Sequence, residues 1–407
     1  MDGTPHMDLI GGAVLDQMIA DSELLDATLR EHSTTLFAPE QRKELRHFTS
    51  NEVADLLGVT TTHLRKLHYD NKIPDVELVK NRRYYSAQDI LDIRTALAQT
   101  HRSPEQFLPG RRKDEHLQVL TVSTFKGGSG KTTMSAHLAQ KLALKGYRVL
   151  SIDCDPQGSL TAMFGMQPRL GSDDTPCIFD AIRYEDPLPM ADVIQKTYFP
   201  NLDLAAGDLI LAEFETQTPH YMASADVPFY LRLSYAIQSV ADDYDVVIID
   251  CPPQLGYLTM SAIVAATGLL ISVVPNMLDV SSLNQYLKMG SNFISLLREQ
   301  MQRNGLDLQH DFVRYAFCRY DGNESSHAQM SGLLRHLFGD RILLKAFVKS
   351  NAVSAAGLDH KTIYEARGGN NVGEINAETL KRAREAFDGA IDEIIDSMHA
   401  AWGRTNG

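Results

Sequence analysis

The spacing of apolar and polar positions divides the chain into three stretches. The first is a predicted helix over residues 9–31, in which one face carries Leu15, Met18, Leu25 and Leu29. A single helix of this length is only marginally stable in water, so it needs a surface to pack against. We expect it to pair with a second copy of the chain, with packing inside the chain as the alternative.

The second stretch, residues 48–98, has the pattern of a small helical module, and the third begins at Leu117. In the third stretch, continuous apolar runs of strand length alternate with helical segments. Such runs are typical of strands buried on both faces in a parallel sheet that helices cover. We therefore predict a doubly wound, mostly parallel α/β fold, with strands at 119–123, 147–153, 202–206, 244–250 and 268–275.

The composition is that of a globular chain. With 43% apolar and 22% charged residues over 407 positions, two globular domains are expected. No apolar run approaches the ~18 residues of a membrane-spanning helix, and the N-terminus lacks a secretory signal pattern, so we expect a soluble, cytoplasmic protein. The four cysteines form no CxxC pair, which argues against a zinc site or a disulfide framework.

The charge is unevenly spread along the chain. A net charge of −13 argues against nucleic acid as a partner of the whole chain, and residues 1–40 carry one basic and eight acidic side chains. Residues 41–113, in contrast, carry fourteen basic and nine acidic ones, which is the expected electrostatic footprint for DNA. A Pro- and Gly-containing run then predicts a linker. The predicted parts are 1–40, 41–100, a linker at 101–116, and 117–407.

A glycine-rich segment follows the first strand of the third stretch. It comprises Phe125, Lys126, Gly127, Gly128, Ser129, Gly130, Lys131, Thr132 and Thr133. Between a strand and a helix, such a turn points successive backbone N–H groups at phosphate oxygens, and glycine lets the backbone come close. The sequence therefore predicts a nucleotide phosphate site, in which Lys131 reaches the β- and γ-phosphates and the Thr132 hydroxyl is a Mg²⁺ ligand.

Two later strands end in acidic residues. Asp153 and Asp155 close one strand, two residues apart and on the same side, and Asp250 closes another just before Pro252 and Pro253. The carboxyl ends of parallel strands meet at one edge of a sheet. These carboxylates are therefore expected to face the phosphates and Mg²⁺.

The three segments, in this order, resemble the deviant Walker A, switch I and switch II motifs of ParA/MinD-type ATPases. The signature K-G-G-x-x-K-[ST] begins at Lys126, while Phe125 stands where the general phosphate-loop pattern has glycine. The resemblance implies that Lys126 crosses a dimer interface to the partner's nucleotide and that Asp155 orients the attacking water. It assigns catalysis to Lys126, Lys131 and Asp155, ATP binding to residues 126–133 and Pro252, and Mg²⁺ to Thr132, Asp153 and Asp250.

The C-terminal part carries a further resemblance. Residues 347–365 look like the tail segment of plasmid and chromosome partition ATPases, which implies a non-specific DNA contact at Lys349, with Arg341 and Lys345 as weaker candidates. The last predicted helix, 378–401, is amphipathic but acidic on its polar face, which argues against a MinD-like membrane anchor. We expect its apolar stripe to pack in the core.

The second stretch resembles a MerR-like winged helix-turn-helix. Two helices capped by Ser and Thr flank Gly58, and a basic hairpin at 80–85 forms the wing. The second helix is expected in the major groove and the wing on phosphates or in the minor groove, with a solvated helical hairpin as the alternative. The predicted contacts are Thr61, Thr62, His63, Arg65, Lys66, Arg82 and Arg83.

Together these parts resemble the partition ATPases of low-copy plasmids, most closely the RepA branch of repABC replication–partition cassettes. The resemblance implies a nucleoid-associated homodimer that hydrolyses ATP slowly with Mg²⁺ and binds nucleoid DNA non-specifically. It also implies stimulation by a ParB-type centromere-binding protein and repression of its own operon through the helix-turn-helix. The alternatives are a transcription regulator that uses nucleotide only as a ligand and a membrane-cycling MinD-like switch.

Overall fold

A computed structural model of the chain describes residues 12–36, 43–76, 78–166, 175–303, 305–369 and 375–404. The chain divides into two compact units, Met1–Glu44 and Leu45–Gly407.

The described part of the first unit contains the helix α1 (Gly12–Leu36). The predicted helix is thus found slightly later in the chain, and residues 9–11 lie outside the described residues, as do the side chains of Leu15 and Leu29. Every large apolar side chain described on α1 is exposed: Val14, Met18, Ile19, Leu24 and Leu25. The helix therefore presents apolar groups to solvent along its length.

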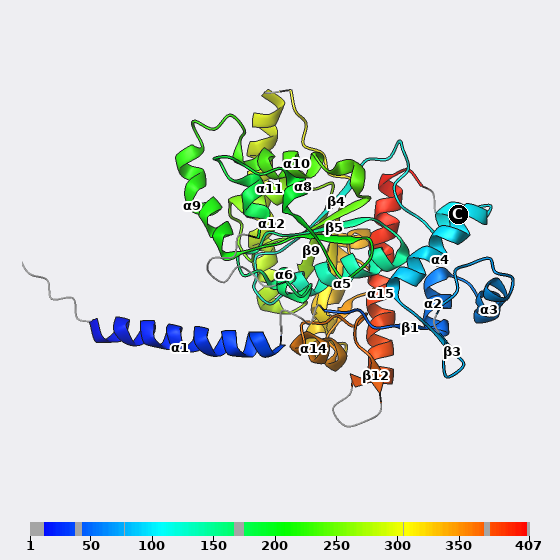
Figure 1. The fold of residues 1–407 in the computed structure, drawn as a ribbon. Coiled ribbons are helices and arrows are strands. Elements are labelled where there is room, and N and C mark those ends of the chain that lie inside the picture. The colour runs from blue at the N-terminus through cyan, green and yellow to red at the C-terminus, as the bar shows by residue number, and fades with distance from the viewer. Residues whose placement is uncertain are drawn as a thin grey trace, which may run out of the picture. The chain divides into compact units, whose positions relative to one another are not determined.

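An eight-stranded sheet forms the centre of the second unit (Figure 1). Its order is β11-β10-β9-β4-β8-β5-β7-β6, and all neighbouring strands are parallel except β6 and β7. The strands are β4 (Gln118–Ser123), β5 (Val149–Asp153), β6 (Ile194–Lys196), β7 (Leu202–Ala205), β8 (Val246–Asp250), β9 (Gly268–Val273), β10 (Phe312–Tyr320) and β11 (Phe347–Val348). The chain passes from β4 to β5 on one side and later reaches β9 on the other. The carboxyl end of β4 is therefore the point where the strand order reverses, which is where open α/β sheets bind ligands.

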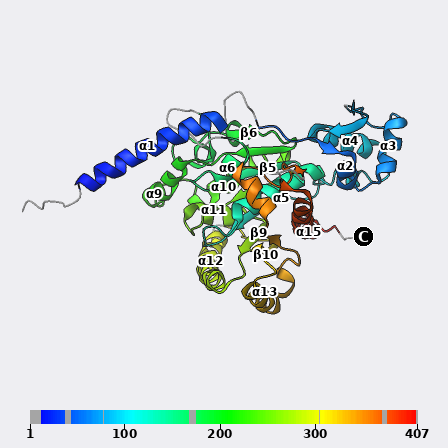
Figure 2. The same ribbon diagram turned by 90° about the horizontal axis from the view of Figure 1, so that it is seen from below.

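Helices cover both faces of this sheet (Figures 1 and 2). One face packs against α5 and α15, the other against α7 to α11, and α12 and α13 cover the part built from β9 and β10. The helices are α5 (Lys131–Lys145), α6 (Ser159–Met163), α7 (Ile178–Ile182), α8 (Met190–Val193), α9 (Ala212–Tyr221), α10 (Phe229–Gln238), α11 (Tyr257–Ala265), α12 (Met277–Arg303), α13 (Ser325–Phe338), α14 (Asn351–Leu358) and α15 (Ala377–Ala401). A short parallel pair, β12 (Gly368–Gly369) and β13 (Ile375–Asn376), precedes α15.

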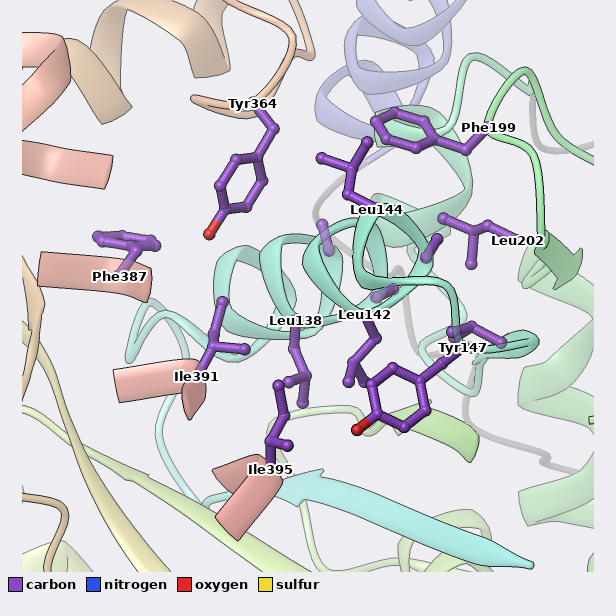
Figure 3. Close-up of a cluster of buried hydrophobic side chains, with 14 of the residues drawn as sticks. Leu138, Leu142, Leu144, Tyr147, Phe199, Leu202, Tyr364, Phe387, Ile391 and Ile395 are labelled. Atoms are coloured by element: carbon purple, nitrogen blue, oxygen red, sulfur yellow. The ribbon is translucent and has the colours of Figure 1, made fainter. Parts of the chain in front are cut away.

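The helix α5 is buried along most of its length because it lies between the sheet and α15. Figure 3 shows Leu138 of α5 directed toward Ile391 and Ile395 of α15, with Phe387 one turn further along. All of these side chains are at most 6% exposed. The apolar stripe predicted for residues 378–401 is thus a core contact, as expected, and it fixes the helix that follows the glycine-rich loop.

Residues 48–100 form the predicted two-helix unit with a hairpin. Its elements are β1 (Phe48–Thr49), α2 (Ser50–Leu57), α3 (Thr61–Tyr69), β2 (Leu78–Val79), β3 (Arg82–Tyr85) and α4 (Ala87–Thr100), and β1, β3 and β2 form a small antiparallel sheet. Thr49 and Glu52 make a capping box at the start of α2, and Gly58, with φ +68°, permits the left-handed turn into α3. Lys80 and Asn81 both have positive φ and form the two-residue turn of the hairpin.

This module shares one hydrophobic core with the sheet, and both views show α2 and α4 next to α5 (Figures 1 and 2). Arg94 of α4 is 3% exposed and connects the parts. It donates from Nε to the Leu144 carbonyl of α5 (2.9 Å), from Nη1 to that of Phe107 (3.0 Å) and from Nη2 to that of Leu56 on α2 (2.5 Å). Burial lowers the pKa of Arg94 to about 10, so it stays charged at neutral pH. The carbonyl ends of two helices supply the compensating negative potential.

A second charged link joins the start of α2 to α15. Glu52 accepts from Arg46 (2.7 Å) and from Arg384 of α15 (3.0 Å). Burial raises the pKa of Glu52, but the hydrogen bonds and charge of Arg46, with help from Arg384, lower it to about 2. The segment predicted as a linker also packs within this unit, because the Arg111 N–H donates to Asp245 (3.1 Å). Residues 45–404 are therefore one body rather than two joined by a free tether.

Candidate nucleotide-binding site

The glycine-rich loop lies between β4 and α5, at the point where the strand order reverses. Gly128 and Gly130 have φ of +71° and +89°, angles at which a residue with a side chain would be strained. A Cβ on Gly130 would also lie only 3.2 Å from the Cβ of Cys318 on β10. The loop is also anchored to the sheet, because the Ser129 hydroxyl forms a hydrogen bond of 3.0 Å with the Ser272 hydroxyl on β9. Such a tight, anchored backbone is what phosphate binding requires.

Lys131 is the first residue of α5 and is only 7% exposed. Its ammonium group donates to the carbonyl of Lys126 (3.2 Å). Burial lowers the pKa of Lys131, while the nearby Asp250 carboxylate opposes that effect. A buried cation beside a helix N-terminus is a strong attractor for an anion such as a phosphate group.

Asp250, at the end of β8, lies against the first turn of α5. It accepts hydrogen bonds from the hydroxyls of Thr132 (2.6 Å) and Ser135 (2.9 Å). Burial raises the pKa of Asp250 to about 6, although both hydroxyls and Lys131 act in the opposite direction. A hydroxyl and a carboxylate this close are the hard oxygen ligands that Mg²⁺ prefers, and the cation would stabilise the ionised form. Thr132 and Asp250 therefore fit a Mg²⁺ ion.

Asp153 lies beside Asp250 in the parallel register of β5 and β8. Its carboxylate accepts from the N–H and hydroxyl of Thr161 (both 2.8 Å) and from the N–H of Asp155 (3.1 Å). Burial, reinforced by the charge of Asp250, raises the pKa of Asp153 to about 7. In this arrangement Asp153 holds the loop that contains the half-buried Asp155. Its predicted place beside Mg²⁺, and the role of Asp155 toward water, stay predictions.

Lys126, the signature lysine, is exposed and forms an ion pair within its own chain. Its ammonium group lies 2.8 Å from a carboxylate oxygen of Asp279, a 7% exposed residue in the first turn of α12. The reach of Lys126 to a partner's nucleotide stays a prediction. Asp279 is the group that Lys126 would leave in making it.

The other residues predicted to bind ATP differ in exposure, and their contact with the nucleotide stays a prediction. Gly127 is exposed, and Pro252 is buried directly after β8. The Thr133 carbonyl accepts from Nδ1 of His137 (2.6 Å), and the Ile363 N–H donates to the other ring nitrogen (3.2 Å). Burial lowers the pKa of His137 to about 4, so the ring is neutral and fixed in one tautomer.

Sequence reasoning missed several residues that contact the loop or its acidic neighbours. Ser135 stands one turn after Thr132 on α5, so its helical spacing was a usable signal. Thr161 stands only eight residues after Asp153, but no pattern in the sequence marks its contact with that carboxylate. Asp279 and Arg319 come from distant segments, and no spacing in the sequence relates them to the loop.

The predicted DNA contacts of the module lie mainly on exposed positions. On α3, Thr62, His63, Arg65 and Lys66 are exposed and Thr61 is half-buried; on β3, Arg82 is exposed and Arg83 is half-buried. Thr60 caps α3, which holds its first turn and the side chains there in a defined direction. Contact of these residues with DNA stays a prediction.

Lys349, the predicted DNA contact of the sheet domain, is half-exposed and paired. Its ammonium group lies 3.2 Å from Glu324 and 3.7 Å from Asp321. A DNA phosphate would have to compete with these carboxylates. Arg341 and Lys345 are both exposed.

Comparison with known proteins places this geometry in a family. A family model described as "AAA domain" matches residues 117–303. The chain is 42% identical over 403 residues to "Putative replication protein A" of Rhizobium rhizogenes, covering 97% of each chain. This chain belongs to the ParA-type partition ATPase family. It is also 30% identical to "Protein SopA" of Escherichia coli K12, over 81% of this chain and 83% of that one.

Solved structures agree on the fold. A "Partition Protein" superposes with a TM-score of 0.64 at 19% identity, covering 93% of this chain and 98% of the other. The Cyanothece McdA(D38A)–ATP complex superposes with a TM-score of 0.54 at 20% identity, covering 69% and 97%. As a member of the ParA-type ATPase family, this chain is an ATPase that uses ATP and Mg²⁺.

Membership of this family explains why few side chains of the site take part in the chemistry itself. Phosphoryl transfer depends on positioning and on balancing negative charge more than on covalent participation of side chains. The ParA-type loop supplies the backbone donors and Lys131, while Thr132 and Asp250 would hold Mg²⁺, which balances phosphate charge when bound. Among the described helices, none is long and apolar enough to cross a membrane.

Proposed function

We propose that this protein is a plasmid partition ATPase that uses ATP to switch between DNA-bound and released states. The observation that carries the proposal is the convergence of Lys131, Thr132 and Asp250 at the carboxyl edge of the sheet. Similarity over nearly the whole length to a ParA-type relative supports it.

In the proposed cycle, ATP and Mg²⁺ close a homodimer. Lys126 leaves Asp279 and reaches the nucleotide of the second copy, and Asp155 orients the water that attacks the γ-phosphate. The exposure of Lys126 supports this step, because its side chain, at 44% exposed, is free to swing toward another anion, while Asp279 stays in place at 7% exposed. Hydrolysis then reopens the dimer.

The proposed protein uses DNA in two ways. Lys349 and its neighbours bind nucleoid DNA without sequence preference, and the exposed face of α3 with the hairpin reads an operator and represses the protein's own operon. The net positive charge of residues 41–113 and the exposure of Arg65, Lys66 and Arg82 support the second role. A ParB-type partner bound to centromere DNA stimulates ATP hydrolysis and follows the resulting gradient.

ATP turnover by the purified full-length protein tests the proposal. Slow turnover that rises with mixed-sequence DNA is expected in the wild type. Lys131→Ala should abolish it, because the cation that faces the phosphates is lost. Asp155→Ala should still bind ATP but lower turnover by about 100-fold, the typical contribution of a positioned proton acceptor.

A matched surface change, Lys381→Ala, is the control for loss of a lysine elsewhere on the chain, since that side chain is 70% exposed. ATP binding without turnover in the wild type under every condition would contradict the partition ATPase and favour a ligand-sensing regulator. Normal turnover in Asp155→Ala would contradict its assigned role alone.

A further inference from the structure

Arg319 stands beside the phosphate loop in an unusual backbone conformation. It is near the end of β10, at a register shift between Cys318 and Tyr320 in the pairing with β11. Its φ is +51°, a value that non-glycine residues seldom adopt. Such a strained conformation persists where the surrounding structure enforces it, commonly at functional sites.

The strained backbone brings the Arg319 side chain onto the loop. Its Nη1 donates to the Gly128 carbonyl at 2.9 Å. A Cβ added at Gly128 would lie 3.7 Å from the same nitrogen, and one at Gly130 would lie 4.0 Å from Cγ of Arg319. The arginine therefore lies along both glycines that carry positive φ in the loop.

The contact fixes the direction of a peptide plane. In a trans peptide, the C=O and the following N–H point in opposite directions. With the Gly128 carbonyl held by Arg319, the N–H of Ser129 points away from the arginine. The guanidinium charge also polarises that peptide, which makes its N–H a better donor to an anion.

We propose that Arg319 is a positioning residue for the phosphates of ATP. It presets the Gly128–Ser129 peptide so that the loop's N–H groups are oriented for phosphate binding without rearrangement. The guanidinium is exposed, and no ion pair joins it to a carboxylate within the described residues. The inference rests on the assignment of residues 126–133 as the phosphate loop.

Binding of adenosine, ADP and ATP to the full-length protein separates this role from others. Arg319→Met keeps most of the side-chain length but removes the charge and the donors. We expect about tenfold weaker binding of ADP and of ATP, the equivalent of one charge-assisted hydrogen bond, and unchanged binding of adenosine. The variant's kcat should stay within about twofold while its KM rises, since the loop holds phosphates in the ground state and the transition state alike.

Two comparisons make the test specific. Arg319→Lys retains a cation that reaches the Gly128 carbonyl and should recover at least half of the ADP-binding free energy lost in Arg319→Met. If the Met variant does not fold, weaker ADP binding with unchanged adenosine binding in the Lys variant still tests the proposal. Arg382→Met removes a cation that is 75% exposed on α15 and should change nothing. Equal weakening of adenosine and ADP would overturn the proposal in favour of a nucleoside contact, and unchanged ADP binding would overturn it outright. If the wild type binds none of the three, the phosphate-loop assignment itself has failed.

Discussion

Both lysines of the signature motif end in contacts within the chain, Lys131 on the carbonyl of Lys126 and Lys126 on Asp279. The two contacts differ in exposure: Lys131 is buried, whereas Lys126 is 44% exposed. The buried lysine is therefore set in place by the fold. The exposed one has room to move, which suits a residue that the proposed cycle moves, although its departure leaves the buried Asp279 carboxylate without this partner.

Replacing Asp279 with Asn should make that movement easier. The neutral side chain keeps the size of Asp279 but loses the charge that holds Lys126, so ATP-dependent dimers should form at about tenfold lower protein concentration, because Lys126 no longer leaves a buried carboxylate unpaired. Sedimentation velocity across a concentration series with ATP and Mg²⁺ measures this. The double variant with Lys126→Met should lose the gain. Weaker dimerisation in Asp279→Asn alone would show that the pair supports the dimer rather than competing with it.

The motif residues of the site were predictable, while their contacts were not. Lys131, Thr132 and Asp250 belong to short local patterns whose chemistry depends on position after a strand. Arg319 and Asp279 reach the loop only because β10 pairs with β9 and α12 packs against β9, next to β4, and a single sequence carries no record of that neighbourhood. The exposed ion pair of Lys349 with Glu324 was hidden for the same reason.

At the scale of elements, α4 is the helix that ties the small module to the sheet. A buried guanidinium with three carbonyl partners and no carboxylate among the described residues depends on all three hydrogen bonds. Gly146, which ends α5, leaves the room for it, since a Cβ there would lie 3.2 Å from Cδ of Arg94 and 3.1 Å from the Phe107 carbonyl.

Arg94→Met should therefore lower the free energy of unfolding by about 3 kcal/mol, because it leaves helix-terminal carbonyls buried without donors. Urea unfolding followed by circular dichroism measures the loss. Arg94→Lys should fall in between, since an ammonium group does not match the fork of a guanidinium. Arg102→Met, an exposed arginine of the same segment, is the control and should stay within about 0.5 kcal/mol of the wild type. An unchanged midpoint in Arg94→Met would show that the module docks through its apolar contacts alone.

Helices and strands with a regular apolar pattern were predictable, and strands with an interrupted or short pattern were not. The five predicted strands are all present, with ends shifted by at most two residues. β10 was missed because Arg314 and Arg319 interrupt its apolar run, and β6 because an edge strand of three residues gives little pattern. The last helix was predicted closely because its apolar stripe extends from Leu380 to Met398 against the core.

At the scale of the whole molecule, the chain has one large unit and one separate helix. The large apolar side chains described on α1 are all exposed, which is the pattern of a helix that associates with a second copy. The position of the small module on the sheet was not predictable. Arg94, which joins the two, has the sequence pattern of a surface arginine on an amphipathic helix, and nothing in that pattern indicates its burial.

Deleting residues 1–44 should abolish association without nucleotide and leave ATP turnover per chain within about twofold, since compact units fold independently. Sedimentation equilibrium without nucleotide, together with turnover at low protein concentration, measures both. Met18→Asp in the full chain is the milder variant: the side chain is 64% exposed, so the charge should break association without unfolding the helix. Equal association constants in all three proteins would show that α1 has another role.

The shared core of residues 45–404 has a consequence for exchange of parts between relatives. A DNA-reading module that is merely tethered can be transplanted at its linker. Here the junction runs through Arg94, Gly146 and the carbonyl ends of α2 and α5. New operator specificity is therefore best introduced by changing exposed residues of α3 within this chain. A chimera joined at residues 101–116 would combine core residues from two proteins that do not pack together.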